Sequence, residues 1–68
     1  MSTITEVQVV GMTCGHCVTA VTEEVSAIDG VSAVEVDLAS GRVVITSEAS
    51  LDGNDISAAV AEAGYQLG

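Results

Sequence analysis

The chain has 68 residues, of which 49% are apolar, so it can form one small domain with a limited core. Ten acidic residues face a single Arg and no Lys, and the formal net charge of −9 argues against binding to nucleic acid or to an anionic membrane surface, both of which recruit basic clusters. No apolar run reaches the roughly 18 residues of a membrane span, and the N-terminal residues lack the pattern of a signal peptide, so we expect a cytoplasmic protein without direct membrane insertion.

A strand and then a helix are predicted in the first part of the chain. Polar and apolar residues alternate over residues 5–10, with Val7 and Val9 on one face, which is typical of a half-buried strand. The apolar residues of the next segment recur at intervals of three and four positions: Val18, Val21, Val25 and Ile28. This spacing predicts an amphipathic helix that ends at Asp29 and Gly30, because Gly30 can adopt the left-handed conformation of a helix C-cap.

A β-hairpin is predicted after this helix. Apolar residues alternate with polar ones in two short segments and are expected to face the core: Val34, Val36 and Leu38 in the first segment, Val43 and Ile45 in the second. The loop of residues 39–41 ends in Gly41, which suits a turn that closes with a left-handed residue. The second strand of the hairpin is expected to cover residues 42–46.

The following segment predicts a second helix and a short last strand. Asp52 can act as the N-cap, and Leu51 before it can pack on Ile56 as a hydrophobic staple. Three apolar residues form the buried stripe of this helix: Ile56, Val60 and Ala63. Gly64 is expected to end the helix, and residues 65–67 to form the final strand.

The predicted order is strand, helix, strand, strand, helix, strand. Two crossovers of helix length imply two βαβ units that are split and interleaved. We therefore expect an α+β fold of the ferredoxin-like type, in which a four-stranded antiparallel sheet carries both helices on one face. No linker or low-complexity segment interrupts the chain, so residues 1–68 are predicted to form a single domain.

The residues suited to chemistry are concentrated in the segment GMTCGHC at positions 11–17. Thr13 is a good N-cap, which makes Cys14 the first helical residue and Cys17 the fourth, so that their sulfur atoms can converge on one point. Unbonded N–H groups and the positive end of the helix dipole favour thiolates there. Two soft thiolates suit Cu(I), which accepts a low coordination number, whereas Zn(II) prefers four ligands. Only His16, a nearby carboxylate or a second molecule would complete a zinc site.

Other interpretations of the cysteine pair stay open. Two buried thiols or a chance disulfide form the simplest alternative. A dithiol–disulfide oxidoreductase is another, because Cys-Gly-His-Cys is also the active-site sequence of disulfide isomerases. Those domains are longer, with Trp before the first Cys and a cis-Pro opposite the pair, and this chain has neither Trp nor Pro. A module that binds Zn(II) or Hg(II) is the third alternative, whereas covalent haem attachment is disfavoured because Val18, not His, follows the second Cys.

On these residues the chain resembles the heavy-metal-associated (HMA) domain family, and within it the small bacterial copper chaperones. The resemblance rests on GMTCGHC, on the order of elements and on AGY at positions 63–65, and it spans residues 5–67. It implies a carrier, not an enzyme, that holds one Cu(I) between Cys14 and Cys17 and delivers it to the metal-binding domains of a copper-transporting P-type ATPase. Zinc-exporting relatives often have Asp where this chain has Thr13, which favours copper. Mercury-binding relatives typically carry a signal sequence.

Three accessory residues have two interpretations each. His16 is either an exposed residue at the helix start or an extra ligand in a metal-bridged homodimer or transfer intermediate. Met12 is a soft thioether and thus a candidate ligand, but the resemblance implies that it packs under the loop. Tyr65 is either a residue at the core edge or, as the resemblance implies, a neighbour of the metal. Glu23 and Glu24 replace the Lys residues common near the first helix of related chaperones, so a locally basic partner is expected. A metal-sensing domain of a larger ATPase is a further alternative.

Overall fold

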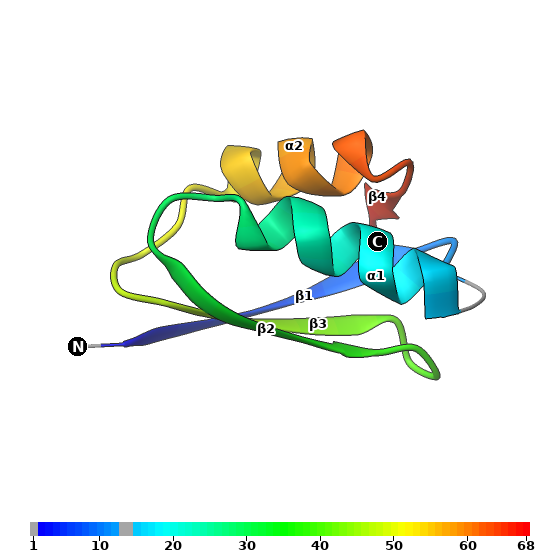
Figure 1. Cartoon of the computed structure of the whole chain (residues 1–68), viewed down its shortest axis with the longest axis horizontal. Helices are drawn as coiled ribbons and strands as arrows, with labels where there is room; N and C mark the ends of the chain where they lie inside the picture. The colour runs from blue at the N-terminus through cyan, green and yellow to red at the C-terminus, as the bar shows by residue number, and fades with distance from the viewer. Residues whose placement is uncertain (1, 13–14) are drawn as a thin grey trace.

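The computed structural model describes residues 2–12 and 15–68, and its elements follow the predicted order (Figure 1). Their bounds are β1 Thr3–Val10, α1 Gly15–Ser26, β2 Val31–Asp37, β3 Arg42–Ser47, α2 Gly53–Glu62 and β4 Gln66–Leu67. Within the described residues, no helix is long and apolar enough to cross a membrane.

The four strands form one antiparallel sheet in the order β2-β3-β1-β4. The two central strands, β3 and β1, pair from Thr3 opposite Ser47 to Gln8 opposite Arg42. Both helices lie on the same side of this sheet, and its other side is left open (Figure 1). The prediction of a ferredoxin-like α+β fold is therefore confirmed.

The core lies between the helices and the sheet. Its buried residues come from both layers: Val9, Val43 and Ile45 from the sheet, and Val21, Val25, Ile56, Ala59 and Val60 from the helices. Val43 and Ile45 are fully buried, as the alternation along the third predicted segment indicates. The buried Val and Ile side chains of both helices thus share one core with Val43 and Ile45 of the central strand β3.

Two expectations about element ends are wrong. Leu38 is 37% exposed and does not join the core, because β2 ends at Asp37 and the backbone turns there. The carbonyl of Asp37 accepts a bond from the N–H of Gly41 at 2.8 Å, which places Leu38 in the turn. The regular part of α1 ends at Ser26, earlier than expected, because the next residues tighten into i→i+3 bonds, with Ile28 N donating to Val25 O.

The start and end of α2 follow the sequence prediction. Asp52 is the N-cap, and its Oδ1 accepts a bond of 2.9 Å from the N–H of Asn54. After the helix, Gly64 has a φ of +96°, and the N–H of Tyr65 donates to the carbonyl of Val60 at 3.0 Å. This is a Schellman arrangement, which reverses the chain sharply and sends Tyr65 back toward the end of β1.

Candidate metal-binding site

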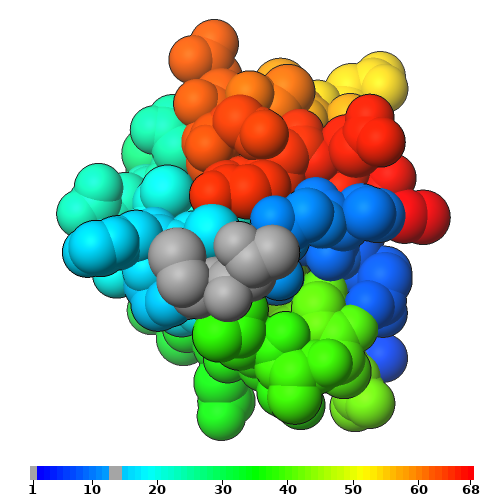
Figure 2. Space-filling model, turned by 90° about the vertical axis from the view of Figure 1, so that its right-hand side faces the viewer, coloured from blue at the N-terminus to red at the C-terminus, as the bar shows by residue number. Residues whose placement is uncertain are grey.

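The motif segment lies at one end of the molecule, where β1 passes into α1. Figure 2 views this end and shows the α2–β4 connection on one side of the start of α1 and the β2–β3 turn on the other. Thr13 and Cys14, a predicted N-cap and a predicted ligand, lie outside the described residues. The described part of the segment comprises Gly11 and Met12 before them and residues 15–17 after them.

Cys17 lies in the first turn of α1 and is 7% exposed. Its position there follows from the sequence, since the helix begins at Gly15 and Cys17 falls on the same face as the core residue Val21. The first turn of a helix presents N–H groups without intrahelical partners and the positive end of the helix dipole. Negative charge on sulfur is favoured in such a place.

The two residues between the cysteines face water. His16 is exposed, and a Cβ built on Gly15 would meet no atom within 4 Å. A side chain at position 15 would therefore meet no other part of the described chain. The exposure of His16 agrees with its interpretation as a helix-start residue, and a role as an extra ligand stays a prediction.

Met12 and Tyr65 connect the segment to the core. Both are half-buried and pack against the core cluster. The ring of Tyr65 also faces Gly11, whose φ is +96°, and a Cβ built on Gly11 would lie 3.4 Å from Cδ1 of Tyr65. Gly11 and Tyr65, which are far apart in the sequence, thus lie next to each other. The position of Tyr65 near a bound metal stays a prediction.

Two features of the described residues were not expected from the sequence. The first is a pair of contacts from the β2–β3 turn to β1, made by Gly41 and by the Gln8 side chain. The second is a depression of about 220 Å³ on the open side of the sheet, lined by residues of β2 and β3 and by none of the motif: Glu35, Val36, Asp37, Arg42 and Val44. Within residues 2–12 and 15–68, no three His, Cys, Asp or Glu side chains are grouped so as to hold a metal ion.

The chain is similar to known proteins over nearly its whole length. Residues 6–66 match the model of the heavy-metal-associated domain. The chain is 44% identical over 61 residues to the copper chaperone CopZ of Bacillus subtilis (strain 168), covering 88% of each protein.

Solved structures give the same result. A structure called CopZ metallochaperone superposes with a TM-score of 0.89 at 30% identity, over 97% of this chain and 100% of the other. The N-terminal domain of a potential copper-translocating P-type ATPase from Bacillus subtilis, solved in the Cu(I)-loaded state, superposes with a TM-score of 0.87 at 28% identity, over 98% of this chain and 85% of the other. With its fold, its motif and its matched length, the chain belongs to the heavy-metal-associated domain family.

Proposed function

We propose that this chain is a cytoplasmic copper carrier that binds one Cu(I) through Cys14 and Cys17 and passes it to a copper-transporting P-type ATPase. The observation that carries the proposal is the position of Cys17 in the first turn of α1, three residues after Cys14 in the sequence, in a chain that matches the HMA domain. The similarity to the copper chaperone CopZ of Bacillus subtilis supports copper as the cargo. Residues 1–68 act as one HMA domain in this proposal, and the chain is a carrier, not an enzyme.

The choice of Cu(I) follows from the number and softness of the donors. Two thiolates satisfy a soft ion that accepts two ligands, and the charge of the thiolates is stabilised at the N-terminus of α1. Each cysteine releases its proton to solvent as its bond to copper forms. An ion held by two ligands keeps room for a further donor. Gly15, between the two cysteines in the chain, adds no side chain that could hinder a partner, and a Cβ at its position would point into open space.

Transfer proceeds by exchange of thiolates, with no change in the oxidation state of copper. A thiolate of the partner forms a bond to the ion, which then has three sulfur ligands, and the bond to one carrier cysteine breaks. A second partner thiolate replaces the other carrier cysteine in the same way, and the carrier thiolates take up protons that the partner thiols release. The likeness to an ATPase N-terminal domain solved with Cu(I) supports a partner with a similar fold and matching donors.

The ligand assignment is tested with single substitutions in the reduced protein under anaerobic conditions. Cys14→Ser and Cys17→Ser each remove one of two ligands and should lower the affinity for Cu(I) by several orders of magnitude, whereas His16→Ala should keep most of it. Tight binding of one Cu(I) per chain in both Cys variants would overturn the assignment. A large loss in His16→Ala would make His16 a third ligand, the arrangement expected in a metal-bridged homodimer.

Transfer itself is measured by mixing the Cu(I)-loaded chain with a reduced ATPase metal-binding domain and separating the two by anion exchange. The net charge of −9 makes this chain bind an anion exchanger strongly. Copper should move to the partner even when a weak Cu(I) chelator is present to trap released ions. Copper found on the chelator, and not on the partner, would exclude direct exchange.

The same samples test the remaining alternatives. A dithiol–disulfide oxidoreductase would turn over a disulfide substrate at catalytic protein concentrations, and the proposal expects no such turnover. A Zn(II) or Hg(II) module would prefer those ions to Cu(I) in direct competition. The competition with Zn(II) is more informative than that with Hg(II). Two thiolates suit any soft ion, Hg(II) included, whereas Zn(II) prefers four ligands.

A further inference from the structure

We propose that the β2–β3 turn positions the start of the metal loop, the segment that begins at Gly11 and leads to the cysteine pair. The turn does so by holding the last residues of β1, with Gln8 and Gly41 as positioning residues. This inference rests on the proposed copper-carrying function. It assigns a role to a turn that contributes no residue to the GMTCGHC segment.

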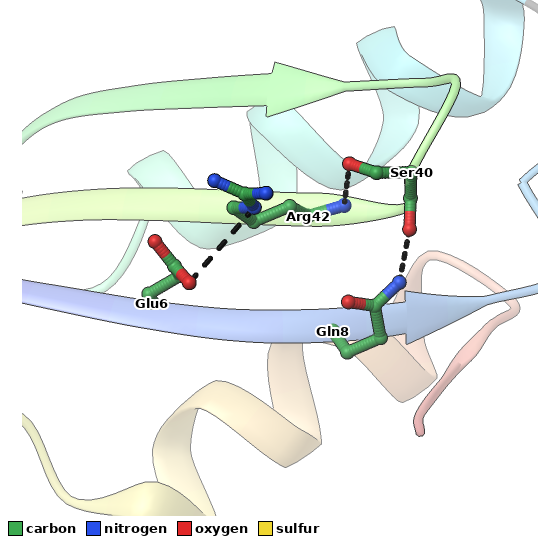
Figure 3. A network of polar contacts seen from close by, with 4 residues as sticks. All are labelled: Glu6, Gln8, Ser40 and Arg42. Carbon is green, nitrogen blue, oxygen red and sulfur yellow. Dashed lines mark hydrogen bonds and ion pairs between the residues drawn. The ribbon is translucent and has the colours of Figure 1, made fainter.

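The turn is bonded to β1 by main-chain and side-chain groups. The N–H of Val9 donates to the carbonyl of Gly41 at 2.8 Å, one residue beyond the last ladder pair, Gln8 opposite Arg42. The side-chain amide of Gln8 donates through Nε2 to the carbonyl of Ser40 (Figure 3). The turn and β1 are thus joined at two successive β1 residues.

The chain's single Arg belongs to the same network. The backbone N–H of Arg42 donates to Oγ of Ser40 at 3.3 Å, and Nε of Arg42 lies 3.9 Å from Oε1 of Glu6. Figure 3 shows the four side chains of this network, two from β1 and two from the turn and the start of β3. The ion pair is more than half exposed on both sides and contributes little. Among these contacts between the turn region and β1, the hydrogen bonds made by Gly41 and Gln8 therefore matter more than the ion pair.

The approach of the turn to β1 requires a glycine. Gly41 has a φ of +74°, and a Cβ on it would lie 2.6 Å from the carbonyl oxygen of Val9 and 2.8 Å from Nε2 of Gln8. The first distance is to a backbone atom, so any side chain at position 41 has to push β1 and the turn apart. No side-chain rotation relieves that contact.

The opposite side of the same β1 residues is held by β4. Val9 pairs with Leu67 and Val10 with Gln66, and the N–H of Gly68 donates to the carbonyl of Gln8 at 2.9 Å. The residues that lead into the motif are therefore fixed from both sides.

This arrangement matters because the loop begins directly after these residues. Gly11 and Met12 follow Val10 in the chain, and the ring of Tyr65, the third residue after α2, lies beside Gly11. A displacement of Val9 therefore moves the start of the loop relative to Cys17, which is fixed in α1. Two thiolates bind one ion well only when their separation is right, and groups that orient metal ligands affect affinity accordingly.

The test compares two glycines that differ in one respect. Gly41 and Gly30 both have positive φ, at +74° and +89°, but a Cβ on Gly30 would meet no atom within 4 Å. Gly30 belongs to the α1–β2 connection, at the other end of the molecule from the motif (Figure 1). Gly30→Ala thus reproduces the backbone strain of Gly41→Ala without the contact to β1.

Cu(I) affinity is measured for both variants against a chelator, in protein shown to be folded by circular dichroism. Gly41→Ala should bind Cu(I) about ten-fold more weakly than Gly30→Ala, in keeping with the effect of groups that orient metal ligands. In the metal-free protein, the amide resonances of Gly11 and Met12 should shift in Gly41→Ala and stay in place in Gly30→Ala. Equal Cu(I) affinities with unchanged Gly11 and Met12 resonances would overturn the inference.

A second variant and a control on the unsubstituted chain complete the test. If Gly41→Ala does not fold, Gln8→Met removes the donor to Ser40 at nearly constant side-chain length; it should shift the same resonances and weaken Cu(I) binding, and an unchanged spectrum and affinity would overturn the inference. If the unsubstituted chain does not compete for Cu(I), the proposed function fails. The resonances of metal-free Gly41→Ala then decide the positioning role alone.

Discussion

The ring of Tyr65 lies against Gly11, at a distance that leaves 3.4 Å between Cδ1 and a Cβ built on the glycine. Tyr65 reaches this place because the Schellman turn at Gly64 reverses the chain at the end of α2. The contact joins the last loop of the fold to the first residue after β1. It also makes the chain's only aromatic residue a natural probe of the metal loop.

Substitution of Gly11 should therefore destabilise the protein. Gly11→Ala places a Cβ in the left-handed region, at a φ of +96°, and in contact with the Tyr65 ring, so we expect a loss of about 1 to 2 kcal/mol in the free energy of unfolding. Urea denaturation followed by circular dichroism measures it. The control is Gly53→Ala in α2, where a Cβ meets no atom within 4 Å; it should leave stability unchanged or raise it by up to about 1 kcal/mol. Equal effects of the two substitutions would contradict the strain at Gly11.

The core can be tested with two isoleucines of the sheet, one buried and one exposed. Ile45 is 0% exposed in β3, and Ile4 is 63% exposed in β1. Ile45→Val should lower the free energy of unfolding by about 1 kcal/mol, because it leaves a small cavity in a packed interior. Ile4→Val, which deletes the same methylene group at the surface, should change it by less than about 0.5 kcal/mol. A loss in Ile4→Val as large as that in Ile45→Val would mean that the open face of the sheet is covered in solution.

The two ends of α2 can be compared with two substitutions that each remove one negative charge. Asp52→Ala removes the side chain that caps Asn54 N and should cost about 1 kcal/mol. Glu62→Ala removes the same charge from the last turn, where the negative end of the helix dipole disfavours a carboxylate, and should be neutral or stabilising by a few tenths of a kcal/mol, on the order of a surface dipole effect. If both substitutions had the same sign and size, net charge and not capping would govern the helix.

The large excess of acidic residues predicts a stabilising effect of salt. Ten acidic side chains repel one another, and the ion pair of Arg42 with Glu6 is too exposed to offset this repulsion. Raising the ionic strength from about 0.01 M to about 0.15 M shortens the Debye length from about 30 Å to about 8 Å. The midpoint of thermal unfolding should therefore rise with NaCl over this range, and a fall would mean that attractive pairs outweigh the repulsion.

Local patterns in the sequence predict most of this fold. Alternation identifies Val43 and Ile45 as core residues, and both are fully buried; the cap at Asp52 and the stop at Gly64 follow from residue types that suit those backbone positions. Leu38 shows the limit of alternation, which continues past Asp37 although the backbone turns there. Periodicity records which face a residue occupies, and it does not record where pairing ends.

The site is predicted less completely, for a physical reason. The sequence places Cys17 at the start of a helix, and the structure has it there. The contacts that hold β1, from Gly41 to Val9 and from Gln8 to Ser40, join segments more than 30 residues apart, as the separation of 32 between Gln8 and Ser40 illustrates. Such contacts depend on which strands pair across the sheet, and the alternation within one strand shows which face a residue occupies but not which strand lies beside it. Thr13 and Cys14 lie outside the described residues, so the roles predicted for them stay predictions.

The copper-carrier proposal requires that the chain bind one Cu(I) tightly. An anaerobic titration of the reduced protein against a chromogenic Cu(I) chelator is the first measurement to make. A parallel titration with Zn(II) measures the selectivity between the two ions. The fluorescence of Tyr65, recorded during both titrations, reports on the metal loop. On the copper-carrier proposal, the chain should take Cu(I) from the chelator up to one ion per molecule and bind Zn(II) far more weakly. Failure to compete for Cu(I), or a preference for Zn(II), would contradict it.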